Sequence, residues 1–132
     1  MEASSLFGTF LQQFVAEIYV SGASLLSGRL GQKAFSDQLT LRNDMNPETN
    51  AGACFFDDEG CVASDFRPTL IDNGILTGLL TTKKSADTFK LPNLGTAAST
   101  YDGVPCLGFN RFYVEPTAPT LSALVPGKAV YV

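Results

Sequence analysis

Three adjacent carboxylates form the densest group of side chains that could do chemistry in this sequence. Asp57, Asp58 and Glu59 directly precede Gly60. Such oxygen ligands bind hard cations such as Ca²⁺ or Mg²⁺, but neighbouring residues of a turn point in different directions, and calcium loops place their ligands at alternate positions. Asp and Gly are also typical turn residues. We therefore favour a turn over a metal site, and keep an enzyme built on these acids as a third hypothesis.

The sequence contains no histidine, which removes the commonest general base and the commonest zinc ligand. Ser-His and Cys-His nucleophile pairs are excluded for the same reason. Cys54, Cys61 and Cys106 have no C-x-x-C spacing and are too few for a four-ligand zinc site. We expect free thiols, since an odd number of cysteines fits a reducing compartment. The sequence thus predicts no catalytic residue, no metal ligand and no cofactor.

Polar pairs near the expected strand ends supply further candidate contacts. None has a base nearby in the sequence that would activate a nucleophile, so they are assigned no reaction. The glycines form no phosphate-binding motif. The candidate interface or ligand contacts are Asp57, Asp58, Glu59, Asn73, Asn110 and Arg111.

Composition narrows the class of protein. The 132 residues include 9 Lys+Arg and 13 Asp+Glu, giving a net charge of −4, which makes nucleic acid a poor partner. The apolar runs are too short to span a bilayer, and an acid stands where a secretory signal needs basic residues. Apolar residues make up 45% and charged residues 17%, so we expect one folded domain over residues 1–132. We therefore expect neither a membrane nor a nucleic acid as a partner.

The N-terminal segment predicts an amphipathic helix over residues 4–21. Its apolar side chains recur in alternating steps of one and three, which keeps them on one helical stripe. Ser4 or Ser5 can cap the helix, and Gly22 can end it. These apolar residues are Leu6, Phe7, Phe10, Leu11, Phe14, Val15, Ile18 and Tyr19.

The rest of the chain favours short strands. Asn73 and Gly74 between two apolar runs predict a type I′ hairpin turn, and Ser85 is expected to cap a helical turn over residues 85–89. Residues 91–108 predict a long loop, of the kind that is usually functional or is ordered by something outside it. Other expected strands cover residues 38–42, 53–56, 61–66, 109–114 and 129–132, with a short helix at 120–125. The prediction is an α+β fold, with one N-terminal amphipathic helix packed on a β-dominated body of short antiparallel strands.

The order of motifs along the chain resembles the TldD/PmbA family, also called modulator of DNA gyrase. Family members have a DDEG turn, a downstream LI.NG.L hairpin, and an SA pair before a glycine-rich loop. The corresponding segments here are residues 57–60, 70–76, 85–86 and 95–97. The likeness extends from about Leu6 to about Val114. Each motif is short, and the order and spacing together carry the resemblance.

In one subunit type of this family, the helix before a glycine-containing loop carries the H-E-x-x-x-H motif of a zinc peptidase. Counting back from Ser24 places these positions at residues 7–12, which read FGTFLQ. Neither histidine nor the glutamate is present. The resemblance therefore implies the PmbA (TldE) side, the non-catalytic paralogue that pairs with the peptidase subunit. The sequence Leu6-Phe7-Gly8 near the start of the chain also resembles the PmbA (TldE) paralogue.

The resemblance implies a cytoplasmic, two-subunit proteolytic system that acts on unfolded peptides. The expected partner is a TldD-like peptidase subunit or a second copy of this chain. Family proteins are several times longer, so the chain is expected to be an inner section that ends before the family's cysteine ligand. The alternative is an independent, homo-oligomeric module that binds a peptide or small ligand through residues 91–108.

Overall fold

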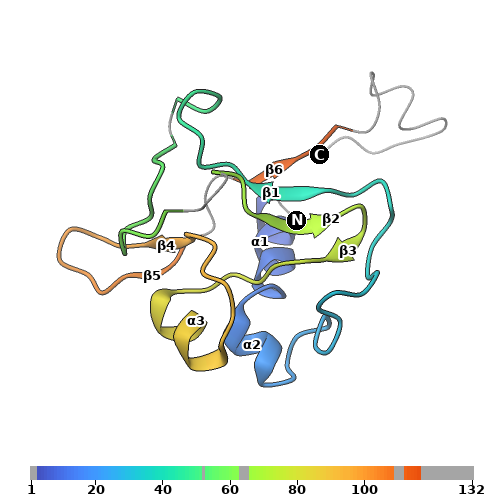
Figure 1. Cartoon of the computed structure of the whole chain (residues 1–132). Helices are drawn as coiled ribbons and strands as arrows, with labels where there is room; N and C mark the ends of the chain where they lie inside the picture. The colour runs from blue at the N-terminus through green and yellow to red at the C-terminus, as the bar shows by residue number, and fades with distance from the viewer. Residues whose placement is uncertain (1–2, 52, 63–65, 109–111, 117–132) are drawn as a thin grey trace.

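The computed structural model describes residues 3–51, 53–62, 66–108 and 112–116 (Figure 1). Its strands form a four-stranded antiparallel sheet in the order β3-β2-β1-β6 and a separate two-stranded unit, β4-β5. The helices are α1 (Ala3–Gln12), α2 (Ala16–Val20) and α3 (Lys83–Phe89). The strands are β1 (Leu41–Asn43), β2 (Thr69–Asp72), β3 (Ile75–Leu76), β4 (Ala97–Ala98), β5 (Cys106–Leu107) and β6 (Phe112–Val114). This architecture confirms the predicted α+β class.

The predicted N-terminal helix is interrupted, so the expectation of one continuous helix is wrong. Residues 13–15 separate α1 from α2, and Val15 has extended backbone angles. The amide of Ala16 donates to the Leu80 carbonyl at 3.0 Å, and the Leu80 amide donates to the Phe14 carbonyl at 2.8 Å. This exchange buries three consecutive side chains, Phe14, Val15 and Ala16, which one stripe of a regular helix cannot do.

The hydrophobic core lies between the helices and the sheet. Leu11 and Phe14 from the helical segment pack in one buried cluster with Leu41, Leu70 and Ile71 from the sheet. Figure 1 shows α1 against the sheet, with α2 and α3 side by side below it. Of the predicted apolar stripe, Leu11, Phe14 and Val15 are buried, whereas Phe7 is exposed.

The hairpin of β2 and β3 has the predicted tight turn. Asn73 and Gly74 both have positive φ, at 46° and 79°, as a type I′ turn requires. The outer edge of β3 is covered by a preceding loop, because Gly31 donates to the Leu76 carbonyl and the Leu76 amide donates to Gln32. Because these backbone groups of β3 are already bonded, they are not available to pair with a strand of another chain.

Several local predictions differ from the structure. Residues 53–56 and 61–62 form no strand: the Ala53 amide donates to the Asn50 carbonyl, and the backbone of Cys61 bonds to Asp57 in the acidic turn described below. α3 is capped by Thr82, whose hydroxyl accepts from the Ser85 amide, and Ser85 closes the capping box from the third helical position. The loop predicted over residues 91–108 contains β4 and β5. The expected helix at 120–125 and strand at 129–132 lie outside the described residues.

Candidate functional site

The acidic segment at residues 57–60 is a tight, self-bonded turn. The Asp57 amide donates to the Cys61 carbonyl at 3.0 Å, and the Gly60 amide donates to the Asp57 carbonyl at 2.9 Å. Asp57 is only 3% exposed, and its Oδ1 accepts from the amides of Glu59 (3.0 Å) and Cys61 (2.8 Å). Side-chain oxygens of Asp commonly close turns in this way. The turn interpretation of this segment is confirmed.

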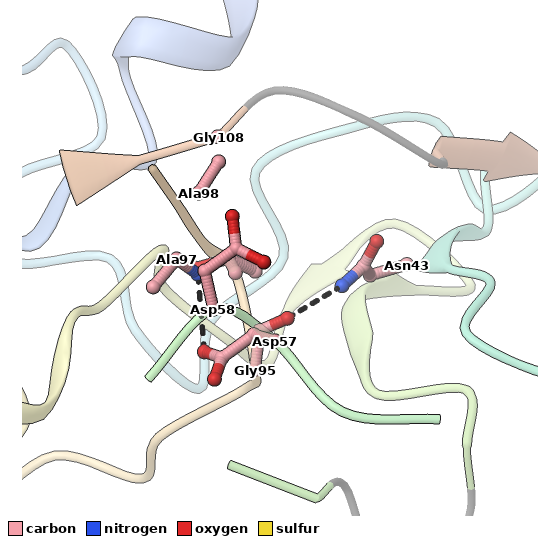
Figure 2. A pocket seen from close by; sticks show the side chains of 8 residues that line it. Asn43, Asp57, Asp58, Gly95, Ala97, Ala98 and Gly108 are labelled. Atoms are coloured by element: carbon pink, nitrogen blue, oxygen red, sulfur yellow. Dashed lines mark hydrogen bonds between the residues drawn. The ribbon is translucent and has the colours of Figure 1, made fainter. Parts of the chain in front are cut away.

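The same turn is attached to the hairpin of β4 and β5. Asp57 Oδ2 accepts from the Ala97 amide at 3.1 Å, and the Asp58 amide donates to the Ala97 carbonyl at 3.3 Å (Figure 2). Asp58 itself is exposed, and its Oδ2 accepts from the Ser99 amide at 2.6 Å. The turn thereby positions β4 beside the end of the main sheet.

Glu59 reaches a third partner, the first residue of α3. Its Oε2 accepts from the Lys83 amide at 2.6 Å, and Lys83 Nζ donates back to the Glu59 carbonyl at 2.6 Å. A carboxylate beside the free amides of a helix N-terminus is favourable. The three carboxylates therefore accept from three different segments: Asp57 from Ala97, Asp58 from Ser99 and Glu59 from Lys83. Within the part of the chain that the structure describes, no group of three or more His, Cys, Asp or Glu side chains could hold a metal ion.

Asn43, at the end of β1, was missing from the sequence-based candidates. Its side chain is 2% exposed, its Nδ2 donates to the Gly95 carbonyl at 3.4 Å, and its Oδ1 has no hydrogen-bond partner. It lines a cavity of about 50 Å³ beside the acidic turn. That volume is large enough for a few atoms or waters. The residues around it include Asn43, Asp58, Gly95, Ala97, Ala98 and Gly108 (Figure 2).

The remaining predicted contacts do not join this site. Asn73 is exposed in the turn between β2 and β3, where its amide nitrogen donates to Asp72 Oδ1 at 3.0 Å. Figure 1 places that turn at the opposite end of the sheet from β4. Asn110 and Arg111 lie outside the described residues. The candidate site therefore consists of the acidic turn and the Asn43 cavity.

The Cys61 thiol lies half-buried at the end of the acidic turn. Its Sγ accepts a hydrogen bond from Asn93 Nδ2 at 3.0 Å. Burial raises the pKa of the Cys61 thiol above its ordinary value, the Asp57 carboxylate raises it further, and the Lys83 ammonium opposes both effects. Cys54 and Cys106 are exposed, and all three cysteines are free thiols.

We expect Cys61 to react with a disulfide reagent more slowly at pH 8 than the exposed Cys54 or Cys106, because the thiolate is the nucleophile, burial raises the pKa of Cys61 above its ordinary value, and its sulfur is less accessible. Single-cysteine variants monitored by Ellman's assay measure the three rates. The difference should shrink as pH rises and vanish in denaturant. Equal rates in the folded chain at pH 8 would contradict the burial of this thiol.

The fold and the motif order define a domain related to metallopeptidases. The sequence profile of the PmbA/TldA metallopeptidase C-terminal domain matches residues 1–132, so the chain belongs to this family. A relative from Methanothermobacter thermautotrophicus named "Metalloprotease" is 31% identical over 101 residues, which cover 76% of this chain and 22% of the relative.

Solved structures agree with the family assignment. TldE from Thermococcus kodakarensis is similar with a TM-score of 0.70 and 25% identity, over 86% of this chain and 26% of that chain. A Bacteroides thetaiotaomicron protein described as a modulator of DNA gyrase has the same fold with a TM-score of 0.63 and 22% identity, over 87% of this chain and 23% of that chain. The chain thus spans about a quarter of the length of these relatives.

The resemblance implies that Phe7 corresponds to the first histidine of the family's H-E-x-x-x-H motif, Gly8 to the glutamate and Gln12 to the second histidine. All three residues lie on α1. Phe7 stacks on Phe10 with ring centroids 6.2 Å apart and contacts Phe112 edge-on at 6.5 Å. A Cβ added at Gly8 would meet no atom within 4 Å. At this place in the fold Phe7 therefore takes part in aromatic packing.

The helices in the described part of the chain are 5 to 10 residues long. None of them is both long and apolar enough to cross a bilayer.

Proposed function

We propose that this chain is a non-catalytic domain of a TldD/PmbA-like metallopeptidase system, in which it contributes structure and a subunit interface. The observation that carries the proposal is the substitution of Phe7, Gly8 and Gln12 at the positions of the zinc-peptidase motif. Neither a phenylalanine ring nor glycine can ligate Zn²⁺, and Gln is not among its usual ligands. The absence of histidine from the whole sequence supports the same conclusion.

The proposed setting is a cytoplasmic, two-subunit machine that cuts peptides. A TldD-like subunit supplies the zinc chemistry, and residues 1–132 form one domain of its partner. Family membership and the similarity to TldE support this setting. The exposed side chains of Phe7, Tyr113 and Val114 give the helix and the β6 edge an apolar character suited to a protein interface.

Reconstitution tests the proposal. We expect the full chain alone to leave an unfolded peptide intact, and to form a complex with a TldD-like subunit that carries H-E-x-x-x-H. Light scattering after size-exclusion chromatography measures the complex, and chelator-sensitive hydrolysis measures its activity. A chain that self-associates and ignores the peptidase subunit would favour the homo-oligomeric binding module instead.

A further inference from the structure

The turn between β2 and β3 contains a pair of residues that can undergo a spontaneous covalent change. Asn73 followed by Gly74 is the only Asn-Gly pair in the sequence, and Asn73 is exposed. In this reaction the Gly74 amide nitrogen attacks the side-chain carbonyl carbon of Asn73, its proton passes to a base, and ammonia leaves as a succinimide ring closes. Glycine favours the attack because it has no Cβ to obstruct the approach. Water then opens the ring to aspartate or isoaspartate.

The folded turn holds the attacking nitrogen in place. The Gly74 amide donates to the Leu39 carbonyl at 2.9 Å, and Gly74 is buried although Asn73 is exposed. The Asn73 amide donates to Thr40 Oγ1 at 3.2 Å, so both amides of the pair are anchored to the chain that leads into β1. A buried proton that is already bonded to a carbonyl is shielded from a base in the solvent. The reaction therefore requires the turn to open.

The same turn has no room for the isoaspartate product. Isoaspartate routes the backbone through the former side-chain carbonyl, which lengthens the chain between residues 73 and 74 by a carbon atom. Gly74 is held on its other side as well, because its carbonyl accepts from the Ala34 and Phe35 amides at 3.0 Å each. A Cβ added to Gly74 would lie 2.6 Å from the carbonyl oxygens of Phe35 and Ser36. A longer linkage therefore cannot close the turn in the same register.

We propose that Asn73 is a deamidation site that the closed β2–β3 turn protects, and that its isoaspartate product prevents the turn from closing again. Water is the only co-reactant, and ammonia is the leaving group. A transient opening of the hairpin thereby becomes a permanent change. The aspartate product differs, because aspartate keeps the backbone length and accepts positive φ. The inference concerns the hairpin alone, so its failure and the failure of the proposed zinc-free role are independent.

Incubation of the full chain at pH 8, both folded and in guanidinium chloride, measures the protection. Peptide mapping by mass spectrometry follows the conversion of Asn73 through its gain in mass, and fragmentation distinguishes isoaspartate from aspartate. We expect Asn73 to react at least about tenfold more slowly in the folded chain, since only the opened turn exposes the Gly74 nitrogen. Equal rates in the folded and denatured chains overturn the proposal.

A matched pair of variants separates opening of the turn from unfolding of the whole chain. Thr40→Val and Thr81→Val each replace a buried threonine by a side chain of the same shape and remove a hydrogen bond. Thr40 Oγ1 accepts from the Asn73 amide, so its loss should raise the folded-state rate about tenfold. Thr81 Oγ1 donates to the Pro92 carbonyl, outside the hairpin, and its loss should leave the rate unchanged. Equal rates in the two variants overturn the turn as the gate.

The refolded products test whether the change is permanent. Chains that have reacted in guanidinium chloride are refolded, the isoaspartate form is separated by chromatography, and its amide hydrogen exchange is followed by NMR. Asn73→Asp supplies the aspartate product in pure form. It should still protect the Gly74 and Leu76 amides, which donate to Leu39 and Gln32. In the isoaspartate form both amides should exchange at least about tenfold faster. Equal protection in the two forms overturns the claim that the turn cannot close again.

Discussion

Gly74→Ala is expected to lower the free energy of unfolding by about 2–5 kcal/mol, the sum of a left-handed backbone conformation and an overpacked contact. Gly74 has φ of 79° in the turn between β2 and β3. A Cβ there would lie 2.6 Å from the carbonyl oxygens of both Phe35 and Ser36. These are backbone atoms that cannot rotate away, and the loop they belong to is held because Ala34 and Phe35 donate to the Gly74 carbonyl.

Gly28→Ala is the matched control for this prediction. Gly28 has nearly the same φ, 75°, but a Cβ there would meet no atom within 4 Å. It should therefore cost only the backbone strain, about 1–2 kcal/mol. Urea denaturation of both variants measures the difference. Equal losses in the two variants would show that the Gly74 turn is not packed against residues 35 and 36.

Asp57→Asn is expected to destabilise the chain by about 3 kcal/mol, because it damages a buried network of hydrogen bonds to a charged group. The asparagine oxygen can still accept from the Glu59 and Cys61 amides. Its NH₂ group, however, would face the Ala97 amide, which now donates to Asp57 Oδ2. Two donors would then oppose each other in a buried position, and the tie between the turn and β4 would be lost.

Asp58→Asn provides the comparison for Asp57→Asn, since the neighbouring carboxylate is exposed. It should change the free energy of unfolding by less than about 0.5 kcal/mol. Thermal and urea unfolding of both variants gives the two values. An enzyme built on the acidic turn makes a different prediction, in which Asp57→Asn and Asp58→Asn both abolish a divalent-dependent activity and leave the fold stable. A stable, inactive Asp57→Asn chain would therefore revive that hypothesis.

Features set by neighbouring residues could be predicted from the sequence. The turn at Asn73 and Gly74 depends on which residues accept positive φ, and the structure has both in that conformation. The acidic turn depends on Asp57 bonding its own segment, within four residues. The apolar stripe of the N-terminal segment likewise follows from its spacing.

Features set by distant partners could not be predicted in this way. The break before α2 depends on Leu80, which lies far along the chain from Ala16. Residues 53–56 and 61–62 form no strand, and the acidic turn between them bonds to Ala97 and Lys83. In each case a partner remote in sequence supplies the hydrogen bonds that local periodicity assigned elsewhere.

Asn43 is an intermediate case. The alternation of Leu39 and Leu41 continues to residue 43 and predicts that its side chain faces inward. Asn43 is, however, also the first residue of a polar, turn-rich run over residues 43–52, which is typical of a surface loop. A buried amide in phase with two apolar side chains is the pattern that could have identified the cavity.

Zinc analysis of the purified full chain tests the central claim most directly. The chain is loaded with Zn²⁺, washed with a weak chelator and measured by elemental analysis. Because Phe7, Gly8 and Gln12 stand at the motif positions and the sequence has no histidine, we predict that no stoichiometric zinc is retained. One tightly held zinc ion per chain, accompanied by chelator-sensitive peptide hydrolysis, would contradict the account.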